Sequence, residues 1–144
     1  MEILIVVFVI LSLIGSISFL KPSKKMKALS AIRHIASKEG FKIGSTQILR
    51  KKFKSWTPQV AIYQIKNDSL YKDMHFVREG DALILYAPMS LKYHEQFPEV
   101  QEKILRLPNS ILEIIFFQSN IAIVWNEMQG REELLKIKAA ILNI

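Results

Sequence analysis

The stretch LEIIFFQSNIAIVWN, residues 112–126, decides the fold of this chain. It holds two runs rich in aromatic and β-branched residues, Leu112–Gln118 and Ile121–Asn126, joined across Ser119 and Asn120. Runs of this composition are typical of β-strands, and a short polar link between them is typical of a tight turn. The stretch therefore predicts a β-hairpin.

More strands and helices are predicted on both sides of the hairpin. Val60–Lys66 and Ala82–Tyr86 are β-prone runs bounded by turn residues. Apolar residues at helical spacing predict helices at about 24–39 and 98–107, and a last helix that opens at Gly130. Helices and strands in this order favour an α+β fold, with an antiparallel or mixed sheet packed by helices on one face.

The N-terminal segment predicts a membrane anchor. Ile3–Leu20 has no charged residue, and a helix of that length spans about 27 Å, close to the thickness of the hydrocarbon core of a bilayer. Lysines follow at once, and the positive-inside bias places that side in the cytoplasm. We therefore expect a transmembrane anchor at 1–20, a basic juxtamembrane helix at 21–40 and a cytoplasmic α+β domain at 41–144. The implied location is the bacterial inner (plasma) membrane, with a single pass and the N-terminus outside.

Small residues lie along one side of this segment. Ser12 and Ser16 are four positions apart with Gly15 beside them, so this face is suited to close packing against a partner helix. The alternative is that the two serines hydrogen-bond back to their own helix. Cleavage of the segment as a signal peptide stays open, although the positive charge that usually precedes such a segment is absent.

The positive charge of the chain is concentrated in residues 21–54. Lys21–Lys54 holds eleven basic residues and one acid, Glu39, so the net charge of +7 arises here. Basic residues clustered beside a membrane attract anionic lipid, with a steep dependence on salt. The membrane and its anionic lipids are therefore the expected partners. The residues expected to face lipid are Lys21, Lys24, Lys25, Lys27, Arg33, Lys38, Arg50, Lys51, Lys52 and Lys54.

The run RKKFKSW, residues 50–56, has other interpretations as well. A strand-like pattern begins at Phe41 and continues through Ile48 and Leu49 into this run. Charges interleaved with aromatic residues resemble a platform for the phosphates and bases of nucleic acid, but no nucleic-acid-binding module surrounds them, so this prediction is disfavoured. A third interpretation is a solvated edge strand whose lysines discourage pairing between sheets.

The sequence carries no pattern typical of a catalytic or metal site. Cysteine is absent, and the three histidines, His34, His75 and His94, do not have the spacing of metal ligands. Neither a glycine-rich phosphate loop nor a Gly-x-Ser-x-Gly motif occurs. We therefore predict a protein that is not an enzyme and that holds no metal or cofactor. An enzyme would be indicated by a pocket in which a histidine meets a carboxylate or a hydroxyl.

The aromatic residues of the domain are candidates for a ligand groove. Tyr63, Tyr86, Tyr93 and Trp125 are the residues predicted to line it. Packing in the core or at its rim is the alternative for all of them. Under that alternative, Trp125 is a core anchor whose indole N–H has a hydrogen-bond partner.

Both ends of the chain resemble a family of small bacterial membrane-anchored proteins. The phrase FLKPSKKMKAL at 19–29, Ile32-Arg33, the phrase GFKI at 40–43 and the phrase VWNE at 124–127 carry the resemblance. Members of this uncharacterised family are often labelled as the accessory preprotein translocase subunit YajC. The resemblance implies an accessory subunit of a membrane complex.

These observations predict a non-enzymatic, membrane-tethered interaction domain, with its basic face toward anionic lipid and its distal face toward a protein partner. The alternative is an accessory, translocase-like subunit of a membrane complex that docks through its transmembrane helix. A membrane protein is then the expected partner.

Overall fold

The computed structural model describes residues 1–20, 23–44 and 46–144, with the side chains of the first helix described as far as residue 16. The chain forms two compact units, Met1–Ala31 and Ile32–Ile144. The first unit holds helix α1 (Glu2–Leu20) and the beginning of helix α2 (Lys24–Lys38), whose remainder belongs to the second unit.

Helix α1 does not provide the predicted membrane anchor. Within the described residues, no helix combines the length and the apolar character that crossing a membrane requires. Crossing a bilayer core of about 30 Å calls for roughly 20 apolar residues in a helix. The predicted transmembrane helix, and the single-pass location in the bacterial inner membrane that followed from it, are therefore wrong.

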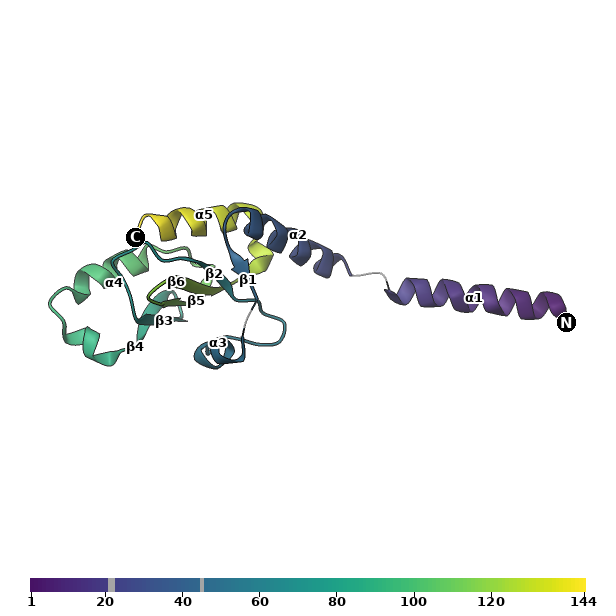
Figure 1. Ribbon diagram of the computed structural model, residues 1–144, viewed down its shortest axis with the longest axis horizontal. Helices are drawn as coiled ribbons and strands as arrows, with labels where there is room; N and C mark the ends of the chain where they lie inside the picture. Colours follow the sequence, from purple (N-terminus) through teal and green to yellow (C-terminus); the bar gives the residue numbers. More distant parts are fainter. Residues whose placement is uncertain (21–22, 45) are drawn as a thin grey trace. The chain divides into compact units, whose positions relative to one another are not determined.

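The second unit is an α+β domain built on a six-stranded antiparallel sheet (Figure 1). The strands stand in the order β1-β2-β6-β5-β3-β4. Their bounds are β1 Lys42–Ile43, β2 Tyr63–Lys66, β3 Met74–Glu79, β4 Ala82–Ala87, β5 Ile111–Phe116 and β6 Asn120–Trp125. The helices are α3 (Gln47–Lys52), α4 (Phe97–Leu105) and α5 (Gly130–Leu142), with short 3-10 turns η1 (Met89–Tyr93) and η2 (Glu127–Gln129).

The hairpin expected from the sequence forms the middle of this sheet. Strands β5 and β6 pair with each other, with Ile114 opposite Ile123. Strand β3 extends the sheet on the β5 side and β2 extends it on the β6 side. Because the backbone of a β-strand is pleated, successive side chains of each strand alternate between the two faces of the sheet. Both faces of the hairpin are apolar, so both have to be covered.

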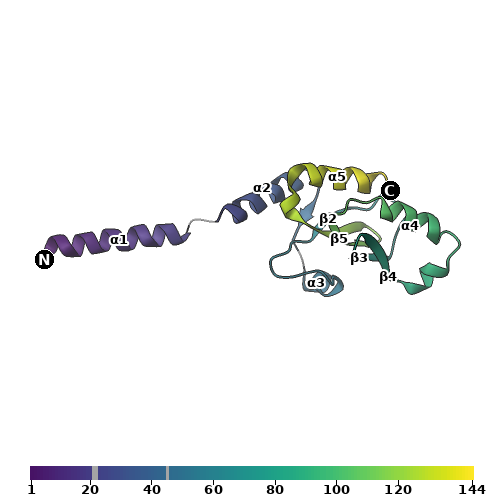
Figure 2. The ribbon, with the colours of Figure 1, turned by 180° about the vertical axis from the view of Figure 1, so that it is seen from behind.

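The larger core lies on the face that α4 and α5 cover (Figures 1 and 2). Ile104 of α4 and Ile137 of α5 are fully buried in the same cluster as Phe76, Phe116 and Trp125 of the strands. Burial of one such side chain contributes roughly 1.5–3 kcal/mol relative to its exposure. This layer accounts for most of the apolar burial in the domain.

A smaller core lies on the opposite face of the sheet, where α3 is found (Figures 1 and 2). Phe53, Ile62 and Val124 belong to it and are buried. The prediction that helices cover one face only is therefore wrong. The predicted strand through Ile48 and Leu49 into the basic run is wrong as well, because these residues form α3.

Helix α3 begins where the sequence offers a cap. The side chain of Thr46 accepts a hydrogen bond from the backbone N–H of Leu49 at 3.2 Å. Such a cap satisfies one of the amide groups that a helix leaves unpaired at its N-terminus. The basic residues Arg50, Lys51 and Lys52 fill its last turn, where positive charge is favourable.

Candidate functional site

A buried carboxylate holds the end of the basic run against the sheet. Glu113 lies in β5 and is 0% exposed. Its oxygens accept hydrogen bonds from the backbone N–H of Lys54 at 3.0 Å and from that of Ser55 at 2.7 Å. Because these donors belong to the main chain, Glu113 fixes the path of the segment that follows α3.

The same carboxylate pairs with a histidine. Nε2 of His75 in β3 lies 2.5 Å from Oε2 of Glu113. Burial alone would raise the pKa of Glu113, but the hydrogen bonds from His75 and from the two backbone amides outweigh it and lower that pKa below its ordinary value. Glu113 is therefore an ionised group in the interior of the protein, with its charge satisfied by hydrogen-bond donors.

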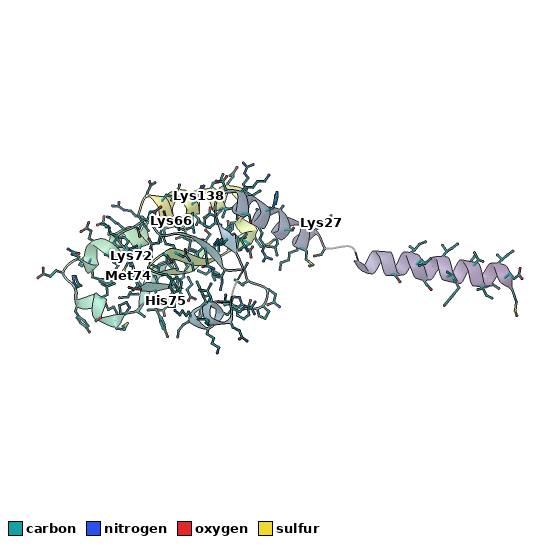
Figure 3. The ribbon with its side chains drawn as sticks, viewed as in Figure 1. Lys27, Lys66, Lys72, Met74, His75 and Lys138 are labelled. Atoms are coloured by element: carbon teal, nitrogen blue, oxygen red, sulfur yellow. The ribbon has the colours of Figure 1, made fainter. Side chains whose placement is uncertain are left out.

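His75 lies in the part of the sheet that faces α3 (Figure 3). Its ring packs edge-on against Tyr86, with centroids 4.9 Å apart, and lies 6.3 Å from the ring of Phe53. The residue is buried but keeps a small exposed area. That area lies at a cavity of about 520 Å³.

This cavity, called the basic pocket below, has cationic and aromatic residues in its wall. Its lining residues are Lys51, Lys52, Lys54, Asp73, Met74, His75, Tyr86, Ala87, Pro88, Ile115, Phe116 and Phe117. The lysines come from α3 and the residues after it, and the other residues come from β3, β4 and β5 or directly adjoin them. Apolar side chains and aromatic rings make up the remainder of the wall, apart from Asp73.

Aromatic rings hold the cations in place. The ammonium of Lys54 lies over the ring of Tyr86 at 4.2 Å from its centroid, and that of Lys52 lies over Phe117 at 5.0 Å. The guanidinium of Arg50 lies over Trp56 at 4.9 Å. Each such contact contributes about 0.5–1 kcal/mol at an exposed position. The contacts orient the cations without neutralising their charge.

A second cavity of about 560 Å³ adjoins the basic pocket. It lies among η1, α4 and the loop before β3, and Asp73, Met74 and Pro88 line both cavities. Oδ2 of Asp73 accepts a hydrogen bond from Nε2 of Gln118. Two acids, Asp73 and Glu99, and two lysines, Lys72 and Lys103, line the second cavity, whereas three lysines and the single acid Asp73 line the first.

Arg33 belongs to a different buried cluster. Its guanidinium donates two hydrogen bonds to Glu127, from Nε at 2.9 Å and from Nη2 at 3.1 Å. The hydroxyl of Tyr63 donates a third, at 2.6 Å. The hydrogen bond to Glu127 raises the pKa of Arg33, and burial followed by the same carboxylate raises the pKa of Tyr63. This cluster joins α2 to the sheet, so Arg33 serves the fold.

The other lysines predicted to face lipid do not line the basic pocket, and they precede its lining residues in the sequence. Lys24, Lys25 and Lys27 are exposed on α2 within the first unit, and Lys38 is exposed at the end of that helix. Lys21 lies outside the described residues. Contact of these lysines with lipid stays a prediction.

The two serines of α1 hydrogen-bond back to their own helix, which is the alternative given for them above. The hydroxyl of Ser12 donates to the carbonyl of Phe8, and that of Ser16 donates to the carbonyl of Ser12, each at 2.9 Å. A methyl group built on Gly15 would meet no atom within 4 Å. A helix-packing face at these three residues stays a prediction.

The predicted aromatic groove is not assembled from its four residues. Tyr63 and Trp125 are buried in the larger core, and Tyr93 is 90% exposed. Only Tyr86, which is 44% exposed, lines the basic pocket. Among the described residues, the indole N–H of Trp125 has no hydrogen-bond partner, contrary to the expectation.

The sequence did not predict that His75 and Glu113 form a pair. The available signal was the single charged residue in the apolar run 111–117, because a carboxylate in a core strand must be paired when it is buried. Across the part of the chain that is described, no group of three or more acidic or histidine side chains is placed to hold a metal ion.

Comparisons with protein-family models, with curated proteins and with solved structures found no match to this chain. The resemblance to proteins labelled as YajC therefore stays a prediction.

Proposed function

We propose that this chain is a non-enzymatic binding domain that recognises an anionic group in the basic pocket. The observation that carries the proposal is the set of three lysines, Lys51, Lys52 and Lys54, around one cavity. Among the described residues, none of the three forms an ion pair with a carboxylate. An anion that enters the pocket provides the missing counter-charge.

The fold supports this proposal because it restricts the motion of the lysine side chains before a ligand binds. Glu113 accepts a hydrogen bond from the backbone N–H of Lys54, and the rings of Tyr86 and Phe117 orient the ammonium groups of Lys54 and Lys52. Side chains that are ordered before binding lose less conformational entropy when the ligand arrives. Attraction between exposed charges is screened by salt, so binding at the pocket should weaken as salt rises.

Nucleic acid remains the weaker candidate for the anion. Phe53, the aromatic residue inside the run RKKFKSW, is 5% exposed and belongs to the smaller core, so it presents no ring for stacking. The rings of Tyr86, Phe117 and Trp56 already carry cations of the protein. A platform for bases needs aromatic faces that are open to the ligand.

A labelled octaglutamate peptide tests the proposal on the full chain. The variant K51E/K52E/K54E should bind the peptide at least about tenfold more weakly than the wild type, a difference of ~1.4 kcal/mol. The matched control K42E/K92E/K136E changes the same number of exposed lysines and therefore gives the same net charge. The affinity of this control for the peptide should stay within about threefold of that of the wild type. Equal losses in the two variants, or no salt-sensitive binding by the wild type, contradict the proposal.

A second candidate function rests on the histidine. A pocket in which a histidine meets a carboxylate is the feature that would indicate an enzyme, and His75 meets Glu113 at the basic pocket. A histidine held in this way acts as a general base in many enzymes when a water or hydroxyl lies within its reach. Hydrolysis of p-nitrophenyl phosphate by the wild type, lost in His75→Gln, supports this candidate, whereas binding without turnover supports the first.

The earlier alternative, an accessory subunit of a membrane complex, stays a prediction. That the head group of an anionic lipid is the anion bound in the basic pocket likewise stays a prediction. Vesicles with and without anionic lipid, added to the octaglutamate assay as competitors, measure whether lipid occupies the same pocket.

A further inference from the structure

The geometry points to a phosphate monoester, carried on an apolar or aromatic body, as the ligand of the basic pocket. The inference rests on the proposed function and names the ligand class. It is argued from the donors around the cavity, from the histidine in its wall and from the size and lining of the space.

The pocket offers more hydrogen-bond donors than a carboxylate can use. Three ammonium groups, each with three N–H donors, come from Lys51, Lys52 and Lys54. A carboxylate has two oxygens and one charge, whereas a phosphate monoester has three terminal oxygens and a charge of about −1.5 to −2 at neutral pH. Phosphate is therefore the anion that pairs with the largest number of these donors.

His75 adds a donor that the lysines cannot replace. Glu113 engages Nε2 of His75, so the imidazole is fixed in orientation and carries its first proton on that nitrogen. Nδ1 is the second nitrogen, and it becomes a donor when the imidazole is protonated. Glu113 acts here as a positioning residue, because it reaches the ligand only through His75.

The remaining wall fits the body of the ligand. A cavity of about 520 Å³ exceeds the space that a phosphate group fills, and it lies within the roughly 300–1,000 Å³ of typical small-molecule sites. Ala87, Pro88 and Ile115 offer apolar contact in the same cavity as the lysines. Asp73 also lines the cavity and repels an anion, so the phosphate should lie nearer to the lysines than to Asp73.

Calorimetry of the full chain with three probes tests the inference. Phenyl phosphate combines both parts of the expected ligand, benzoate keeps the ring but carries a carboxylate, and inorganic phosphate lacks the ring. Phenyl phosphate should bind at least about tenfold more tightly than either of the others. Equal affinities for phenyl phosphate and benzoate overturn the inference.

The variant His75→Gln should lose most of the preference for phenyl phosphate over benzoate while it keeps weak, salt-sensitive binding of both. His34→Gln, at an exposed histidine on α2, is the matched control and should keep the preference. A preference that persists unchanged in His75→Gln overturns the inference.

The loss of a buried partner of Glu113 can unfold the His75 variant, so a measurement on the wild type stands beside it. The ring ¹⁵N resonances of His75 should shift when phenyl phosphate is added, and unshifted resonances at saturation overturn the inference. Failure of all anions to bind overturns the proposed function as well, whereas binding without preference for phosphate overturns this inference alone.

The phosphate has two conceivable sources, a phosphorylated side chain of a protein and a free small molecule. A peptide with one phosphotyrosine and uncharged flanks distinguishes them. Tighter binding of the peptide than of phenyl phosphate supports the protein source, and equal binding supports the small molecule.

Discussion

Two buried carboxylates, Glu113 and Glu127, tie separate segments to the same sheet by different means. Glu127 is held by side chains, the guanidinium of Arg33 and the hydroxyl of Tyr63. Glu113 is held by backbone amides of the segment after α3 and by the imidazole of His75. Glu127 is paired with a permanent cation, whereas the imidazole that binds Glu113 also lines a cavity.

This difference separates a structural ion pair from a candidate functional one. Substitution of Arg33 or Tyr63 removes a partner of Glu127 directly. Substitution of Lys54 leaves the backbone N–H that binds Glu113, so the basic pocket can change its charge without losing its shape. The comparison therefore predicts that the fold depends on Glu113 more than on the lysines that Glu113 helps to position.

The largest expected effect is at Glu113 itself. Glu113→Gln removes a charge that three donors satisfy in a fully buried position, and loss of one partner in such an arrangement costs roughly 3–5 kcal/mol. Urea denaturation should show this decrease in the free energy of unfolding. Glu99→Gln, at an exposed position of α4, is the control and should change it by less than about 0.5 kcal/mol. A loss below about 1 kcal/mol at Glu113 would mean that its hydrogen bonds add little to stability.

Acid should narrow the difference between the wild type and Glu113→Gln. The pKa of Glu113 is lowered in the folded protein, so the unfolded state takes up the proton first as the pH falls. The stabilisation by Glu113 is complete above the unfolded pKa of about 4.3 and is lost as the pH falls through the lower folded pKa. Melting temperatures of the two proteins between about pH 7 and pH 3 should therefore converge at the acid end. A constant gap across this range contradicts an ionised Glu113.

Loss of a partner of Glu127 should lower the free energy of unfolding by a smaller amount, because Arg33 remains bound to this carboxylate. Tyr63→Phe removes the hydroxyl that donates to Glu127, while Arg33 keeps both of its hydrogen bonds. The loss of a hydrogen bond to a charged group lowers the free energy of unfolding by about 1.5–3 kcal/mol. Tyr93→Phe, which alters a largely exposed tyrosine, serves as the control in the same denaturation experiment. If Tyr63→Phe and Tyr93→Phe have the same free energy of unfolding, the hydroxyl of Tyr63 does not contribute to stability.

Local sequence patterns predicted the elements that are also determined locally. The hairpin at 112–126, the strand at Ala82 and the helices that follow Pro98 and Gly130 appear within a few residues of their expected bounds. Strand β3 was not predicted, because Met74–Phe76 is buried on successive residues and shows no alternation. Helix α3 was taken for a strand because its apolar residues are too few to establish a helical period.

The candidate pocket was beyond the reach of these patterns. Glu113 lies 59 residues from Lys54 and 38 residues from His75 in the chain, so only the completed sheet brings them together. The charge of the run 50–56 was visible in the sequence. Its placement over the rings of Tyr86 and Phe117 depends on β4 and β5, which no spacing within the run encodes.

The smallest expected effect concerns the helix that carries the lysines. Thr46→Ala removes the side chain that caps α3 and should lower the free energy of unfolding by about 0.5–2 kcal/mol. Thr46→Ser keeps a hydroxyl at the cap and should stay close to the wild type. A helix of six residues adds little stability of its own, so the loss should appear first as faster hydrogen exchange at Leu49, whose amide the cap binds. Exchange at Ser55 should stay slow, because its amide is bound by Glu113 and not by the cap. Equal acceleration at both amides would mean that the helix and the Glu113 contact open together, and the basic pocket would then be one cooperative unit.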